Sequence, residues 1–237
     1  MSFETTPSRL SKSRSALPVH RIVIAFGVAV ALAIGWPVGF ASSTEARIGV
    51  LELDPSKTLV EFKLGGSLHT THGEFKLKGG TIKAHSATGK AEGAIVVDAT
   101  SGDSGDSLRD NRMKDSVLEA QTYPEITFTP QHIDGHLDSG GGFQAKLEGL
   151  LKLHGVEHKV RIEARGTLTG DSLVAIAHFS VPYVEWGLKD PSVLFLTVAK
   201  EVDIDIAAAG HVTWLSDEKA PTQASQRGSN PKLGNQE

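Results

Sequence analysis

The feature of the sequence that most constrains the fold is a two-residue alternation of apolar and polar side chains, which recurs along most of the chain from Val50 onward. It is clearest in two neighbouring segments, residues 143–153 and 160–168, where apolar or small residues occupy every second position. Charged and amide side chains take most of the positions between them. Because successive side chains of a β-strand point to opposite faces, this period predicts long strands with one apolar face.

Turn residues separate these segments at the spacing of an antiparallel meander, with turns expected at Gly79–Gly80 and His154–Gly155. One stretch, residues 106–122, lacks the alternation and is predicted to contain a short helix on a long loop, with Asp106 or Ser107 as its N-cap. The expected strand segments are residues 59–64, 73–78, 90–99, 125–129, 143–153, 160–168, 173–181 and 193–208.

Long strands that are apolar on one side have to bury that side, and a closed barrel buries it and removes the sheet edges as well. We therefore predict an all-β fold, an extended antiparallel eight-stranded barrel. Small residues on the inward face leave volume inside and favour a cavity, and they are Gly149, Ala145, Ala164, Gly166, Ala175 and Ala177. The alternative is a solid core in which the small residues accommodate large neighbours. The expected cavity wall consists of Phe62, Phe75, Ile95, Phe128, Phe143, Leu147, Ile162 and Phe179.

Two aromatic residues, Tyr183 and Trp186, flank a predicted bend at Pro182 and Gly187. An amphipathic ring can face both an apolar ligand and water, so these residues are candidates for one mouth of the barrel. Ordinary core packing explains them equally well.

The first 46 residues have the pattern of an export signal. A basic, polar stretch precedes an uncharged apolar run at residues 22–41, and small residues follow. The run is nearly long enough to span a bilayer, so it serves either as a cleaved signal peptide or as a retained membrane anchor. Both interpretations place residues 47–212, the expected barrel, outside the cytoplasm. Residues 213–237 are rich in polar residues and are predicted to form a disordered tail.

Composition excludes several classes of function. The net charge of −4 offers no basic surplus for a nucleic acid. The chain has no cysteine, which excludes thiol catalysis and thiolate metal ligands. The pairs His69/His72 and His154/His158 lie at expected turns and strand ends, where their spacing does not converge on a metal.

The segment at residues 101–106 has calcium-like oxygen donors but lacks the order of an EF-hand, so we interpret it as a turn before the helix. We expect Arg109, Asp110 and Arg112 to tie that helix to the barrel rim through ion pairs. No nucleophile motif occurs in a context suited to a hydrolase. The sequence therefore implies no metal, no cofactor and no catalytic residues.

Five segments follow one another in order between Leu51 and Gly210, and they are LDPSKTLVEFKL, HGEFKLKGGTI, SGDSGDSLRDNRMKDSVLEAQTYPEITFTP, LEGLLKLHGVEHKVRIEARG and FSVPYVEWGLKDPSVLFLTVAKEVDIDIAAAG. In this order the chain resembles the YceI-like proteins. The resemblance implies a lipocalin-like barrel, exported to the periplasm, whose elongated apolar pocket takes a polyisoprenoid chain or a similar lipid. It implies no catalytic constellation.

These observations predict a non-enzymatic protein that transports or sequesters a long apolar lipid, such as a polyisoprenoid or isoprenoid-quinone chain, with possible membrane association through residues 22–41. The alternative from another class is a solid-core structural or partner-binding module at the outer face of the membrane. A weaker alternative is a hydrolase acting at a barrel mouth. The sequence does not specify the oligomeric state.

Overall fold

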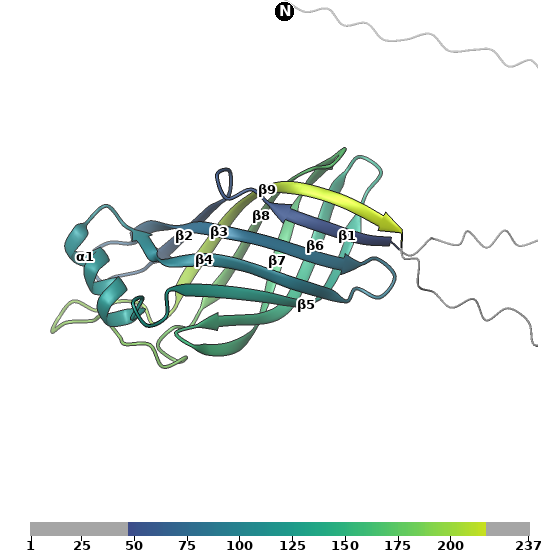
Figure 1. Cartoon of the computed structure of the whole chain (residues 1–237). Coiled ribbons are helices and arrows are strands. Elements are labelled where there is room, and N and C mark those ends of the chain that lie inside the picture. Colours follow the sequence, from purple (N-terminus) through teal and green to yellow (C-terminus); the bar gives the residue numbers. More distant parts are fainter. Residues whose placement is uncertain (1–46, 217–237) are drawn as a thin grey trace, which may run out of the picture. The chain divides into compact units, whose positions relative to one another are not determined.

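The structure, a computed structural model, describes residues 47–216, and the predicted leader (1–46) and most of the predicted tail (217–237) lie outside the described residues. The described chain forms a sheet of long strands with one helical excursion (Figure 1). The elements are β1 (Arg47–Leu53), β2 (Leu59–Leu64), β3 (Thr71–His85), β4 (Ala91–Asp103), α1 (Ser107–Arg112), the π-helix η1 (Met113–Val117), β5 (Glu125–Leu137), β6 (Gly142–Leu153), β7 (Val156–Thr169), β8 (Ser172–Val181) and β9 (Val202–Ser216).

The sheet closes on itself. All the pairings are antiparallel, and the strand order is β1-β3-β2-β9-β8-β7-β6-β5-β4, with β3 also pairing with β4. Strands β1 and β2 each pair with both β3 and β9, so together they fill a single position in the barrel. The nine strands therefore make the eight-stranded antiparallel barrel that the sequence predicted.

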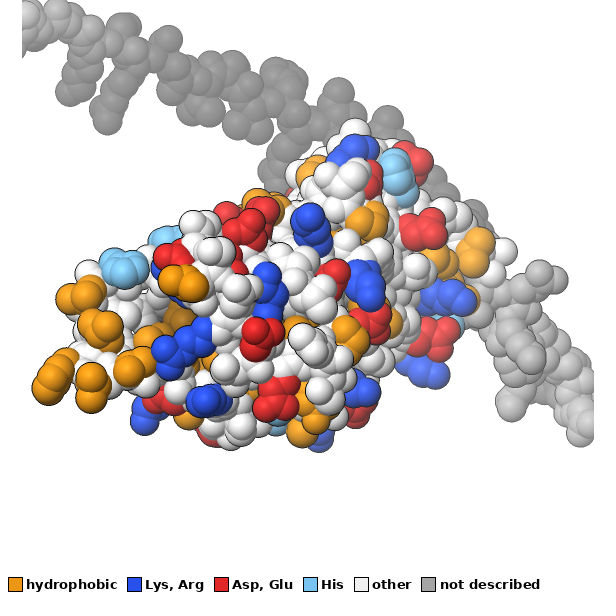
Figure 2. Space-filling model, turned by 60° about the vertical axis from the view of Figure 1, so that its left-hand side comes forward, with side chains coloured by type: hydrophobic (Ala, Val, Ile, Leu, Met, Phe, Trp, Pro, Cys, Tyr) orange, Lys and Arg blue, Asp and Glu red, His pale blue; other side chains and the backbone are white. Residues whose placement is uncertain are grey.

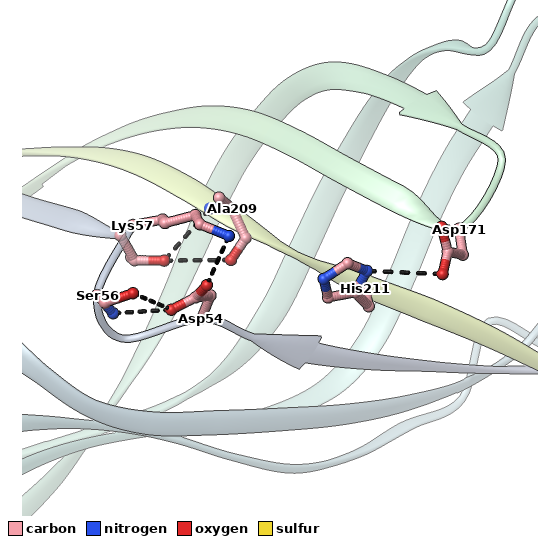
Figure 3. Close-up of polar contacts among 7 residues, drawn as sticks. Asp54, Ser56, Lys57, Asp171, Ala209 and His211 are labelled. Atoms are coloured by element: carbon pink, nitrogen blue, oxygen red, sulfur yellow. Dashed lines mark hydrogen bonds and ion pairs between the residues drawn. The ribbon is translucent and has the colours of Figure 1, made fainter.

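The break between β1 and β2 is a compact turn held by side chains (Figure 3). The carboxylate of Asp54 accepts hydrogen bonds from the Ser56 amide at 2.9 Å and the Ser56 hydroxyl at 2.6 Å, and it lies 3.1 Å from Lys57 Nζ. These contacts, led by the Ser56 hydroxyl, lower the pKa of Asp54 to about 2. Thr58 Oγ1 then bonds both the amide and the carbonyl of Ala209, so that β2 resumes beside β9.

The helical excursion follows β4 and begins as predicted. The Asp106 side chain caps α1 by accepting hydrogen bonds from the amides of Leu108 and Arg109, both at 3.0 Å. The prediction that Arg109, Asp110 and Arg112 form ion pairs with the barrel rim is wrong, because none of the three forms an ion pair among residues 47–216. Asp110 is buried and accepts hydrogen bonds from the amide and hydroxyl of Ser104, while Arg109 donates to the hydroxyl and carbonyl of the same serine. The segment is thus stabilised by its own polar groups.

Two other sequence predictions require correction. Gly79–Gly80 is not a turn, because β3 runs through it with a shift in its register against β4 at Leu77–Gly79. A glycine within a strand often marks such a bulge. The last strand begins at Val202 rather than at Val193, because Val193 and Leu196 bond each other's backbone and Leu194 has a φ of 50°. That turn cannot continue as an extended strand.

The His154–Gly155 turn is confirmed. The two residues have φ values of 51° and 79° and connect β6 directly to β7. Positive φ at both central positions is the requirement of a type I′ turn, one of the common two-residue hairpin turns. The turn sets the register in which Leu153 faces Val156.

Candidate functional site

The barrel encloses an apolar cavity of about 1010 Å³. Every strand contributes to its lining, and along β2 and β9 the lining residues are the alternate ones, such as Val60, Phe62 and Ile204. The charged residues between them point outward, where Lys63 Nζ lies 2.7 Å from Asp205 Oδ2. The strand period thus separates an apolar interior from a charged exterior, and the interior is not solidly filled.

Most of the residues expected in the cavity wall line this cavity. They come from β2, β3, β4, β5, β6, β7 and β8, and from the turn that follows β8. The expected residues found in the lining are Phe62, Phe75, Ile95, Phe128, Phe143, Leu147, Ile162, Phe179 and Tyr183. Trp186 does not line it. Its indole stacks on the His158 ring with centroids 4.0 Å apart, and it packs against the buried cluster around Phe128.

One part of the cavity wall is a row of small side chains. Ala145 pairs with Ala164 between β6 and β7, and Ala164 pairs with Ala177 between β7 and β8, and all three line the cavity. Gly149, also expected to leave volume, does not. A Cβ at Gly149 would lie 2.4 Å from the Thr129 carbonyl oxygen and 2.8 Å from the Phe128 ring, so this glycine allows close packing instead.

Thr58, in the middle of the barrel, lines the cavity, but its hydroxyl bonds the Ala209 backbone. The charged and histidine lining residues lie at the two ends of the barrel. At the end that carries α1 they include Asp106, Arg109 and Arg112, which belong to the excursion between β4 and β5. At the opposite end they include His85 and His136, near the ends of β3 and β5. The cavity therefore extends from one end of the barrel to the other, with a long apolar middle section.

Sequence reasoning missed the contribution of the helix to the cavity. Leu108, Met113 and Arg112 all line it. A helix that projects from a β-meander reaches its neighbours only through tertiary structure, and the sequence signals its cap but not the direction of its side chains. The apolar residues Leu108 and Met113 were the available sequence signal that the helix contributes to the lining.

Both members of the His154/His158 pair have identifiable neighbours. His154 Nε2 lies 3.2 Å from Glu119 Oε2, and its ring lies 4.4 Å from that of Tyr123, whereas His158 stacks on Trp186. Between residues 47 and 216 no three His, Cys, Asp or Glu side chains are grouped as they would be around a metal ion. The same residues contain no helix long and apolar enough to span a bilayer.

Tyr183 is the most perturbed titratable residue of the lining. Its ring is buried, and its hydroxyl donates a 2.7 Å hydrogen bond to the Ala199 carbonyl, which connects the turn after β8 to the residues before β9. Burial, with a smaller effect from the Asp190 carboxylate, raises the pKa of Tyr183 from 10.0 to about 12. The folded pKa lies above the unfolded one, so the stabilisation is present below pH 10.0 and is lost as the pH rises towards 12.

Tyr183→Phe is expected to lower the free energy of unfolding by about 1 kcal/mol near neutral pH, because the Ala199 carbonyl loses its donor. The difference from the wild type should shrink between pH 10.0 and 12, where only the wild type has this phenol to ionise. Urea unfolding at a series of pH values measures both effects. A difference that stays constant over that range would contradict the assignment.

The family of the chain follows from a comparison of its sequence with family models. The model of the YceI-like domain matches residues 51–209, more than half of the chain. The chain belongs to the YceI family. The matched range begins within β1 and ends within β9, so this YceI-like domain is the barrel itself. A comparison with curated protein sequences gives no significant match.

Solved structures share the fold of this YceI-like chain. The crystal structure of BcnA from Burkholderia cenocepacia is 22% identical, with a TM-score of 0.55, and the match covers 66% of this chain and 98% of that one. The structure of a polyisoprenoid binding domain from Saccharophagus degradans, implicated in plant cell wall breakdown, is 18% identical, with a TM-score of 0.51, and covers 69% and 98% of the two chains. Since nearly all of each solved chain is matched by the barrel, the barrel is a self-contained fold.

Proposed function

We propose that the barrel binds one long apolar lipid chain, of the polyisoprenoid or isoprenoid-quinone class, and carries or sequesters it without chemical change. The observation that supports this most strongly is the cavity of about 1010 Å³, open along the barrel and apolar in its middle section. Membership of the YceI family and the fold shared with a polyisoprenoid binding domain support the same ligand class.

The energetics suit a chain-like ligand. Each roughly 100 Å² of apolar ligand surface removed from water contributes about 2.5 kcal/mol, and an isoprenoid chain presents apolar surface along its whole length. Several isoprene units therefore offset the cost of immobilising the chain. Affinity arises from length and shape, which agrees with a middle section lined by Phe, Leu, Ile and Ala side chains.

The distribution of polar and apolar residues along the cavity wall favours binding over catalysis. Catalysis by acid–base or nucleophilic groups requires polar side chains within hydrogen-bond reach of one reacting atom. In the described barrel the charged and histidine lining residues lie at the two ends, and in the middle section the hydroxyl of Thr58 is already bonded to the Ala209 backbone. The hollow interior also disfavours the solid-core structural module. The predicted leader (1–46) motivates placing this carrier outside the cytoplasm.

The proposal is tested by organic extraction of the purified protein followed by mass spectrometry. We expect close to one long-chain isoprenoid lipid per protein after expression in a host that makes such lipids. A delipidated sample should take up added long-chain polyprenol to the same stoichiometry. Absence of a co-purifying lipid together with no uptake of polyprenol would overturn the proposal.

A further inference from the structure

The end of the barrel that carries α1 exposes large apolar side chains on separate segments. Leu194 and Phe195, between β8 and β9, are 92% and 94% exposed, Leu108 on α1 is 81% exposed, and Leu68 between β2 and β3 is 76% exposed. Figure 2 shows hydrophobic side chains gathered at this end, on the left of the view. We call these four residues the apolar tip.

The segments of the apolar tip belong to one surface. The Ser67 amide bonds the Thr197 carbonyl at 2.9 Å, which places Leu68 beside the loop that carries Leu194 and Phe195. Leu108, Val193 and Leu196 all line the cavity. Apolar surface thus continues from the apolar tip into the interior of the barrel.

Exposed apolar side chains of this size mark an interaction surface. The apolar tip projects from loops and a helix end instead of forming a groove, which suits insertion into a soft apolar layer more than packing against a folded protein. Helices and loops at a membrane surface insert such side chains roughly 5–10 Å, to the boundary between headgroups and acyl chains.

Charge at the rim of this surface is consistent with lipid headgroups. Arg112 is exposed and lines the cavity mouth, and no side-chain partner for it occurs among residues 47–216. Two acidic residues of the segment are already engaged, since Asp110 bonds Ser104 and Asp106 caps α1. A guanidinium so placed can bond a lipid phosphate.

We propose that the apolar tip docks on the surface of a lipid bilayer, so that a lipid chain passes between the bilayer and the cavity without crossing water. The lipid transfer in this inference rests on the proposed function, but the docking itself is measured independently of lipid binding in the cavity. The partner is a bilayer, and neither a second copy of the chain nor a protein partner is required.

The test uses residues 47–237, because the apolar run at 22–41 would itself bind membranes and the barrel is a self-contained fold. Flotation with vesicles of phosphatidylethanolamine and phosphatidylglycerol measures the bound fraction. The double variant Leu194→Ser/Phe195→Ser is expected to lower the partition coefficient by about tenfold or more, since two exposed apolar side chains no longer insert. The matched control Val174→Ser/Leu215→Ser, which removes exposed apolar side chains of β8 and β9 that do not line the cavity, should leave it unchanged.

Circular dichroism and thermal unfolding establish whether each variant is folded. If the double variant is not folded, the single variant Phe195→Ser replaces it. Equal vesicle binding by the wild type and the tip variant would overturn the inference, as would absence of vesicle binding by the wild type. A dimer in sedimentation velocity that the tip variant dissociates would overturn it too, because the partner would then be a second copy.

Polyprenol uptake separates this inference from the proposed function. The tip variant should take up detergent-dispersed polyprenol to the wild-type stoichiometry but acquire it from vesicles several-fold more slowly. Vesicle docking without any polyprenol uptake would refute the carrier and leave the docking surface intact. Polyprenol uptake without vesicle docking would refute the docking surface and leave the carrier function intact.

Discussion

Ala164→Phe is expected to reduce polyprenol binding by roughly tenfold to a hundredfold, because overpacking of a filled interior costs about 1–3 kcal/mol. Ala164 is the central residue of the small row in the cavity wall, between Ala145 and Ala177. A phenyl ring there would occupy space in the cavity and interrupt the path of a long chain. Without lipid, the same ring fills open space, so the empty barrel should remain folded.

Titration of the delipidated protein with a polyprenol measures this effect, with Ala207→Phe as the matched control. Ala207 belongs to β9 next to the lining residues Ile206 and Ala208, but it is exposed and does not line the cavity. The control should bind like the wild type. Equal binding by Ala164→Phe and the wild type would show that the lipid does not occupy the interior, whatever its affinity.

Phe128→Ala is expected to lower the free energy of unfolding by about 3–5 kcal/mol, the usual loss for a buried phenylalanine. Its side chain is 5% exposed, belongs to the main buried cluster, and lies against Gly149, where an added Cβ would come within 2.8 Å of the ring. Gly149 has no side chain that could move into the space, so the cavity would enlarge instead of collapsing.

Urea unfolding of the delipidated protein provides this measurement. Phe195→Ala makes the same chemical change at a side chain that is 94% exposed, and it should change the stability by less than about 0.5 kcal/mol. Bound lipid stabilises the folded state in proportion to its concentration, so both variants have to be compared without it. Similar losses for the two variants would contradict the packing assigned to Phe128.

Prediction from sequence succeeded where a local rule applied. The period of two identified the faces of the strands, which is why Phe62, Phe143, Ile162 and Phe179 all line the cavity. The Asp106 cap and the His154–Gly155 turn follow from similarly local chemistry. Prediction failed at Gly79–Gly80, where neighbouring strands absorb a bulge, and at Val193–Glu201, where apolar residues form a loop instead of a strand.

At the site, the positions of Trp186 and Arg112 also could not be predicted from local sequence. Both are single residues in irregular segments, without a period to assign a direction. The structure stacks Trp186 on His158 outside the lining and brings Arg112 to the cavity mouth.

The sequence alone determined that the chain forms long antiparallel strands with one apolar face, and that such strands close into a barrel, because these properties depend on neighbours two residues apart and on the burial of a continuous apolar face. Only the tertiary structure decided that β1 and β2 share one strand position, that Ala145, Ala164 and Ala177 meet in one row, and that the residues of the apolar tip lie at one end of the barrel. Those features bring together segments far apart in the chain, and their positions follow from register and closure, which no local pattern encodes.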